Sequence, residues 1–259
     1  MNDDADDARE ATASKREAAA SFGAAASDYH ESRAHGEGAD LETLGGWCAG
    51  ADRALDVATG GGHTAGAVRR AGVPDVVATD AAPEMVATAV DAFDVRGVVA
   101  DAERLPFASN SFDAVACRLA THHFPDPESF LAEVERVLAP GGVFAFEDNV
   151  APADPVLADH VNRFERLRDP THGTLRSREW WVDHLEAAGL AVREHEVLPR
   201  RLDFGDWCAR ADVSPNDRET LAAMLRDPPE GGEAFYDVGT SDGYVDSFLV
   251  HSGLFRAQG

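Results

Sequence analysis

The stretch LDVATGGGHTA, residues 55–65, decides how this chain folds. A short apolar run ends in its first four residues, and Gly60-x-Gly62-x-x-Ala65 follows directly. That spacing fits the G-x-G-x-x-G/A fingerprint, in which a strand turns tightly into a helix and the loop holds a dinucleotide. Glycine spacing alone also occurs in ordinary tight turns, so the neighbouring residues must identify the ligand.

Short apolar runs alternate with helical patterns around this loop. We expect buried strands at 53–58, 75–80, 97–102, 112–118 and 142–148, and helices at 63–72, 83–93 and 127–142, the last stopped by Pro140-Gly141-Gly142. Two further strands are expected at 191–204 and 244–255. The pattern predicts an α/β fold: a Rossmann-like, doubly wound, mostly parallel seven-stranded sheet with helices on both faces and a helical cap.

Composition and the pattern of apolar residues change along the chain, and these changes predict four segments. They are an acidic tail and lid helix (1–35), a cofactor-binding core (36–150), a cap helix (151–176) and the rest of the sheet (177–259) with a helical insertion at 205–240.

The charge balance is strongly acidic. Asp and Glu total 47 against 23 Lys and Arg, a formal net charge of -24, and Lys15 is the only lysine. Such a surface repels nucleic-acid phosphates and anionic lipid, so neither is expected as a partner. A well-solvated acidic face would explain the charge. We favour instead a high-salt cytoplasm, as in halophilic archaea, where salt screens the self-repulsion.

Three cysteines, Cys48, Cys117 and Cys208, are widely spaced and never form a C-x-x-C pair. This argues against a disulfide framework or a metal site and for reduced thiols. The N-terminus lacks the apolar core of a signal peptide, and no run approaches the ~18 apolar residues that span a bilayer. We expect a cytoplasmic protein, and the sequence leaves its oligomeric state open, a monomer and a homodimer being two possible states.

Acidic residues stand at the ends of the first three expected strands. Asp56, four residues before Gly60, would face the start of the next helix. A carboxylate there would repel a pyrophosphate, at a cost on the order of 1 kcal/mol, and attract an ammonium group. Asp80 suits a ribose diol, Asp101 an adenine amine, and Met85 offers a polarizable face to the ring. S-adenosylmethionine carries all of these groups and no phosphate.

Four longer segments resemble the motifs of a known family. LDVATGGGHT, VVATDAAPEMV, DAERLPFASNSFDAVACR and VLAPGGVFAFED are similar to motifs I to V of class I S-adenosylmethionine-dependent methyltransferases, the small-molecule type 11 branch related to quinone-biosynthesis enzymes. The resemblance covers nearly the whole chain after about the first fifteen residues. It implies S-adenosylmethionine as cofactor and the binding residues Asp56, Thr59, Gly60, Gly62, Asp80, Ala81, Met85, Asp101, Ala102 and Cys117.

The resemblance also implies how the binding residues are used. Gly60 and Gly62 would pass near the methionine part and Asp80 would bind the ribose. Asp101 would bind the adenine amine, with the Ala102 N–H near the ring. One departure concerns the acceptor: the quinone enzymes carry a glycine-and-asparagine motif after the fourth strand, whereas this chain has THHFPDP. A quinone acceptor is therefore not implied.

Methyl transfer needs a nucleophile near the activated methyl group and, for many acceptors, a base. His122 and His123 follow the fourth expected strand, where the acceptor would meet the methyl group, and are the candidate catalytic residues. Adjacent side chains point in different directions, so at most one should face the acceptor. The structural alternative is that one ring packs under Phe124 and the other hydrogen-bonds the loop.

The expected lid and cap supply candidate acceptor-binding residues. These are Tyr29 and His35 in the lid and Arg168 and His172 in the cap, where a turn would meet the substrate. The alternatives are helix packing for Tyr29 and surface ion pairing for cap arginines. Apolar residues around the cap (Phe124, Phe164, Leu167 and Trp207) hint at a small, partly apolar acceptor.

Two other functions remain open from the residues. A nicotinamide-dependent oxidoreductase would use the same loop, but Asp56 and the lack of a later Tyr-x-x-x-Lys pair oppose it. A non-catalytic cofactor-binding module would use its cap for a protein partner. The sequence does not distinguish O-, N- and C-methylation.

Overall fold

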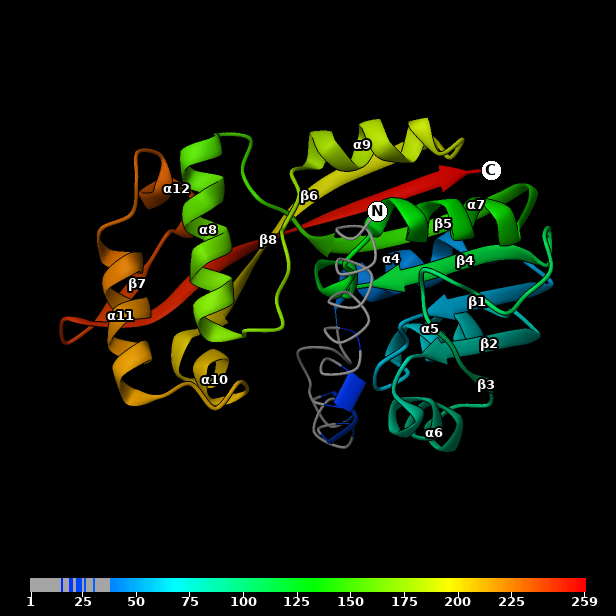
Figure 1. Cartoon of the computed structure of the whole chain (residues 1–259), viewed down its shortest axis with the longest axis horizontal. Coiled ribbons are helices and arrows are strands. Elements are labelled where there is room, and N and C mark those ends of the chain that lie inside the picture. Colours follow the sequence, from blue (N-terminus) through cyan, green and yellow to red (C-terminus); the bar gives the residue numbers. More distant parts are fainter. Residues whose placement is uncertain (1–14, 16–18, 21, 25, 27–29, 31–37) are drawn as a thin grey trace, which may run out of the picture. The chain divides into compact units, whose positions relative to one another are not determined.

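The computed structural model describes residues 15, 19–20, 22–24, 26, 30 and 38–259. They form two compact units (Figure 1). The first unit comprises the described residues up to Asp148 with Val182–His195 and Leu254–Gly259, and the second comprises Asn149–Trp181 and Glu196–Gly253. Within the described part of the chain, no helix combines the length and apolar character that crossing a bilayer requires.

Eight strands form one sheet. They are β1 (Arg53–Val57), β2 (Asp75–Asp80), β3 (Arg96–Val99), β4 (Phe112–Arg118), β5 (Leu138–Asn149), β6 (Ala191–Asp203), β7 (Gly239–Ser241) and β8 (Tyr244–Gln258). Their order is β3-β2-β1-β4-β5-β8-β6, with β7 on β8. The pairs from β3 to β5 are parallel, which confirms the doubly wound α/β fold. The sheet has one strand more than expected because β7 forms a short antiparallel pair with β8.

The strand order reverses at β1. From β1 the chain builds outward through β2 to β3, and β4 then pairs with the other side of β1. In open sheets of this kind, ligands bind outside the carboxyl ends of the strands at such a reversal. The glycine loop follows β1 at this point, so the topology places it where a ligand site is expected.

Helices cover both faces of the sheet in the first unit. They are α4 (Ala39–Trp47), α5 (His63–Arg70), α6 (Pro83–Ala92), the short 3-10 helix η1 (Thr121–His123) and α7 (Pro127–Val137), while α9 (Arg178–Ala187) crosses the boundary between units. Alanines of β1, β2, β4 and β5 share a buried cluster with residues of α4 and α5. On the opposite face Phe144 packs against Phe130 of α7, with ring centroids 6.0 Å apart. Small side chains on one face therefore let α4 and α5 approach closely.

The expected helix at 127–142 is shorter than predicted. It ends at Val137, and Leu138 already begins β5. Pro140-Gly141-Gly142 thus lies in a strand irregularity, where the β4–β5 register shifts between Phe112 and Ala114. A Cβ at Gly142 would lie 2.8 Å from the Ala139 carbonyl oxygen and 2.9 Å from that of Asp113. The glycine is therefore needed for close strand packing and does not terminate the helix.

The second unit contains the expected helices of the cap and the insertion. They are α8 (Pro155–Arg168), α10 (Phe204–Ala209), α11 (Pro215–Arg226) and α12 (Gly232–Tyr236). Asp154 caps α8 by accepting from the N–H groups of Val156 and Leu157. The core is aromatic: the Phe164 ring stacks on Trp207, with centroids 4.8 Å apart, and Trp207 contacts Phe248 at 5.0 Å.

Candidate functional site

Asp56 anchors the loop between β1 and α5. Its side chain is buried, and Oδ2 accepts from the Thr59 hydroxyl at 2.6 Å and the Ala65 N–H at 2.9 Å. The carboxylate therefore faces the first turn of α5, as the sequence predicts. Burial raises the pKa of Asp56 to about 7, against the opposing effect of these two hydrogen bonds. Oδ1 is also buried and accepts no hydrogen bond from the residues that the structure describes.

Asp80, at the end of β2, ties two loops together. Oδ2 accepts from the Gly60 N–H and Oδ1 accepts from the Ala82 N–H, both at 3.0 Å. Burial raises the pKa of this carboxyl, although the backbone N–H groups oppose the rise. Each carboxylate oxygen has a further lone pair, so Asp80 can hold the loop and accept from a ligand hydroxyl together.

The two fingerprint glycines have different physical roles. Gly60 has a φ of 51°, and a Cβ built there would meet no atom of the described residues within 4 Å. Gly62 has a φ of 87°, and a Cβ there would lie 2.8 Å from Ala89 Cα and 2.9 Å from a ring carbon of Phe93. Close packing on α6 thus explains Gly62, whereas open space surrounds Gly60.

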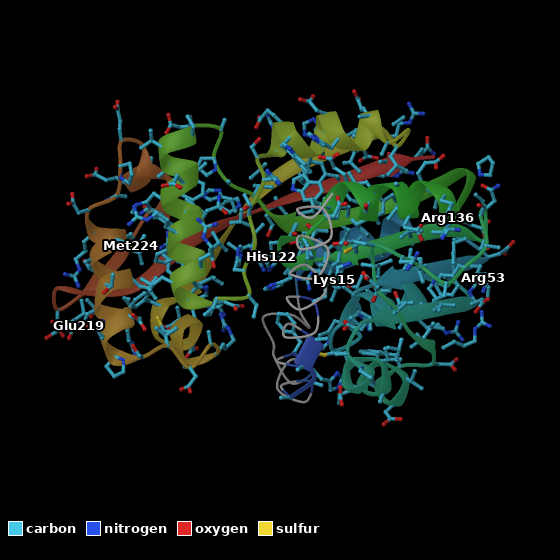
Figure 2. The ribbon with its side chains drawn as sticks, viewed as in Figure 1. Lys15, Arg53, His122, Arg136, Glu219 and Met224 are labelled. Carbon is cyan, nitrogen blue, oxygen red and sulfur yellow. The ribbon has the colours of Figure 1, made fainter. Side chains whose placement is uncertain are left out.

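Lys15 reaches Asp101, which the sequence analysis assigned to the adenine amine. Its Nζ lies 2.7 Å from Asp101 Oδ2 and 2.5 Å from Glu103 Oε2 (Lys15 is labelled in Figure 2). Oδ1 of Asp101 accepts from the Glu103 N–H at 3.0 Å. Lys15 belongs to the predicted N-terminal segment 1–35, and its contact with Asp101 was not predicted from the sequence. Only its rarity, as the single lysine of an acidic chain, marked it out.

Other described N-terminal residues also lie over this part of the sheet. Ala26 forms a small buried cluster with Ala82 and Met85, and Phe22 packs against it. His30 Nδ1 lies 3.0 Å from the Gly61 carbonyl oxygen. The predicted lid residues Tyr29 and His35 fall outside the described residues.

Acidic side chains gather around Cys117 of β4. The thiol is fully buried, and burial raises its pKa well above the ordinary value. The negative charges of Asp148, Asp56 and Asp80 raise this pKa further. Three strands thus bring their carboxylates to one place. Such a concentration of negative charge disfavours an anionic ligand and favours a cationic one.

The arginine that follows Cys117 in β4 pairs with two other carboxylates, and its charge opposes only part of the rise that burial causes in the pKa of Asp56. Arg118 is buried, and its Nη2 lies 2.5 Å from Asp40 Oδ2 while its Nε lies 2.8 Å from Glu147 Oε2. Its single positive charge is shared between two buried carboxylates. Asp56, Asp80 and Asp148 add further acidic groups at this end of the sheet, and a cationic ligand would favour the ionised form of Asp56, whose pKa burial raises.

His122 and His123 lie in η1, directly after β4, and have different partners. His122 Nδ1 lies 2.6 Å from Asp148 Oδ1 (His122 is labelled in Figure 2). Oδ2 of Asp148 accepts from the His122 N–H at 2.9 Å and from the Thr121 hydroxyl. The ring of His123 contacts Phe22 edge-on, with centroids 4.7 Å apart. Asp148 was not among the predicted site residues, although it ends an expected strand.

The remaining predicted cofactor residues take three kinds of position. Thr59 is buried in its hydrogen bond to Asp56, and Met85 is buried in the cluster described above. Ala81 is exposed, and Ala102 is half-buried.

The predicted cap residues belong to the second unit. Arg168 donates from Nε to the Trp207 carbonyl oxygen at 3.2 Å, and its guanidinium lies 4.8 Å from the centre of the Trp207 ring. His172 is buried. The apolar residues expected to surround the acceptor mostly pack inside clusters instead, since Phe164 and Trp207 are both buried and Phe124 contacts Phe130. They no longer indicate the polarity of the acceptor.

Comparison with known proteins identifies the family of this chain. The methyltransferase domain family matches residues 55–146. The uncharacterized methyltransferase YcgJ of Bacillus subtilis is 36% identical over 199 residues, which are 74% of this chain and 78% of that protein. The crystal structure of B. subtilis YcgJ superposes with a TM-score of 0.79 at 30% identity, covering 85% of this chain and 97% of that one.

A further relative is named for quinone biosynthesis. The ubiquinone/menaquinone C-methyltransferase UbiE of Desulfotalea psychrophila is 35% identical over 155 residues, 58% of this chain and 63% of that protein. The similarity to methyltransferases covers most of the chain in both sequence and fold. It therefore favours a methyltransferase over an oxidoreductase or a non-catalytic cofactor-binding module. The chain therefore belongs to the class I methyltransferases and catalyses S-adenosylmethionine-dependent methyl transfer.

Proposed function

We propose that S-adenosylmethionine binds at the carboxyl ends of β1, β2 and β3 and that the methyl acceptor is a small molecule. The observation that carries the cofactor site is the group of carboxylates, Asp56, Asp80 and Asp148, around Cys117. A sulfonium and an ammonium group bring two positive charges into such a field, whereas a dinucleotide would bring a pyrophosphate. This is a methyl-transfer site in which electrostatics select the cofactor.

Each part of the cofactor has a candidate partner. Asp56 attracts the ammonium group, with Gly60 giving the methionine part room because no atom lies within 4 Å of its Cβ position. Asp80 accepts from the ribose hydroxyls through lone pairs not used by the two backbone N–H groups. Asp101 accepts from the adenine amine. The remaining members of the set are Thr59, Gly62, Ala81, Met85, Ala102 and Cys117.

The acceptor side of the site lies at η1, with His122 and His123 as its candidate catalytic residues. Arg168, His172, Tyr29 and His35 remain proposed acceptor-binding residues. The small-molecule class rests on the resemblance to the type 11 branch, and the strongly acidic composition supports a high-salt cytoplasm as the working environment.

Calorimetry with four probes tests the cofactor site. S-adenosylmethionine and S-adenosylhomocysteine should bind, NADH should not, and S-inosylhomocysteine, which carries a carbonyl in place of the adenine amine, should bind weakly. Asp101→Asn should weaken S-adenosylhomocysteine about tenfold, because one charge-assisted hydrogen bond is worth roughly 1.5 kcal/mol. The same variant should tighten S-inosylhomocysteine, since the new amide can donate to its carbonyl.

The matched control is Asp91→Asn, which removes one carboxylate from an exposed position on α6. It should bind all four probes as the parent chain does. Tight NADH binding with no uptake of S-adenosylhomocysteine would reject the proposed site.

A further inference from the structure

A buried carboxylate fixes one of the two adjacent histidines. Asp148 is 1% exposed, and both of its oxygens are used within η1. Oδ1 lies 2.6 Å from His122 Nδ1, while Oδ2 accepts from the His122 backbone N–H and the Thr121 hydroxyl. Side chain and backbone of His122 are thus held by the same carboxyl group, which restricts the ring to one orientation.

This arrangement also selects the tautomer of His122. An ionised carboxylate only accepts hydrogen bonds, so the ring must place its hydrogen on Nδ1. The lone pair of the neutral imidazole then lies on Nε2, the atom directed away from Asp148. In free histidine the hydrogen prefers Nε2, so the Nδ1–H tautomer of His122 depends on the carboxylate.

The described contacts of His123 are of another kind. Its ring packs edge-on against Phe22 and lies tilted against His122, with centroids 4.7 Å and 4.3 Å apart. The two histidines, equivalent in the sequence, are therefore physically different.

We infer that Asp148 is a positioning residue that holds His122 with Nε2 as the proton acceptor for methyl transfer. The inference rests on the proposed function of this site and goes beyond it by choosing between the histidines and by limiting the acceptor to molecules that lose a proton, through an O–H, N–H or activated C–H group. When bound, the cofactor supplies the methyl group, and its sulfonium becomes a neutral thioether as the electron pair of the broken bond returns to sulfur.

The methylated atom of the acceptor gains one bond to carbon and loses one to hydrogen. That proton moves to Nε2 of His122, and the resulting imidazolium is stabilised by the negative charge of Asp148 on its other nitrogen. Water removes the proton after the product leaves.

Nitrogen NMR of the full chain, labelled with ¹⁵N-histidine, tests the inference without an identified acceptor. Long-range proton–nitrogen correlation should show His122 protonated at Nδ1 and unprotonated at Nε2 at pH 8. Asp148→Asn should shift His122 toward the Nε2–H tautomer, while His123→Gln should leave it unchanged. His122→Gln assigns the signals.

Titration with S-adenosylhomocysteine tests the role of Asp148 and the proposed cofactor site separately. It should shift the ring signals of His122 and leave those of His184, on α9, in place. If the compound binds but parent His122 carries its hydrogen on Nε2, the role of Asp148 is overturned and the cofactor site stands. If the compound does not bind at all, the proposed function itself fails. Even if Asp148→Asn does not fold, the tautomer of His122 measured in the parent chain tests the role of Asp148.

Discussion

The Nζ of Lys15 lies 2.7 Å from Oδ2 of Asp101, so the chain's single lysine contacts the carboxylate proposed to bind the adenine amine. Glu103 adds a second contact at 2.5 Å. Partial burial alone would lower the pKa of Lys15, but the hydrogen bonds and charges of both carboxylates raise it. The lysine is therefore charged at neutral pH and takes a place that a ligand amine would need.

Lys15→Gln should consequently speed cofactor association. In this variant the adenine amine does not have to displace the Lys15 ammonium from Asp101. We therefore expect S-adenosylhomocysteine to associate several-fold faster, as measured by stopped-flow fluorescence. Lys15→Arg keeps the charge and serves as the control, with a rate close to that of the parent. An unchanged or slower rate in Lys15→Gln would show that the lysine does not compete with the ligand.

Asp56→Asn should change how stability depends on pH. Burial raises the pKa of Asp56 from the ordinary 3.8 to about 7, so between these values the folded chain keeps a proton that the unfolded chain loses. The fold is therefore destabilised progressively as pH rises from about 4 to about 7, and by a constant amount above that. One pKa unit is worth about 1.4 kcal/mol, and the full effect is a few kcal/mol.

The asparagine does not ionise and its Nδ2 takes the place of Oδ1, which makes no hydrogen bond. The difference in free energy of unfolding between the variant and the parent should thus grow in favour of the variant from pH 5 to pH 8, measured by urea denaturation. A difference that stays constant across this range would contradict the raised pKa. Cofactor affinity should fall in the same variant, because the ammonium loses its charged partner.

Alanine substitutions should separate the two fingerprint glycines. Gly62→Ala places a Cβ 2.8 Å from backbone of α6 at a φ of 87°, so it should lower stability by several kcal/mol. Gly60→Ala is strained by its φ but meets no atom within 4 Å, so the loss should be about 1 kcal/mol.

Gly50→Ala is the matched control for Gly60→Ala. Gly50 also has a positive φ, 89°, with nothing within 4 Å of its Cβ position, but it lies between α4 and β1. Both variants should lose similar stability in urea denaturation, and only Gly60→Ala should weaken S-adenosylhomocysteine in calorimetry. Equal cofactor affinity in the two variants would place the methionine part elsewhere.

Potassium chloride should stabilise this protein. With a net charge of -24, mutual repulsion between surface carboxylates opposes folding, and salt shortens its range to a few Å at molar concentration. We expect the melting temperature to rise steadily between 0.1 and about 2 M KCl. Sucrose, which carries no charge, is the control for general solute effects. A melting temperature that is indifferent to KCl would remove the high-salt interpretation.

The local pattern of the sequence predicted seven of the eight strands that the structure describes. β2 and β4 have the predicted bounds, because a strand buried on both faces needs an uninterrupted apolar run. The end of α7 was wrong, since glycine and proline stop a helix in one context and permit a strand bulge in another. Local propensity does not distinguish these, whereas the approach of Gly142 to Asp113 does.

By itself, the sequence determined that acidic residues end successive strands of a doubly wound sheet, because alternation of apolar runs and helices fixes where strand ends fall. Only the tertiary structure decided which side chains meet there. Lys15 and Asp101 are 86 positions apart and His122 and Asp148 are 26 apart. Contacts over such separations depend on how strands pair and helices pack, and no local pattern in the chain encodes them.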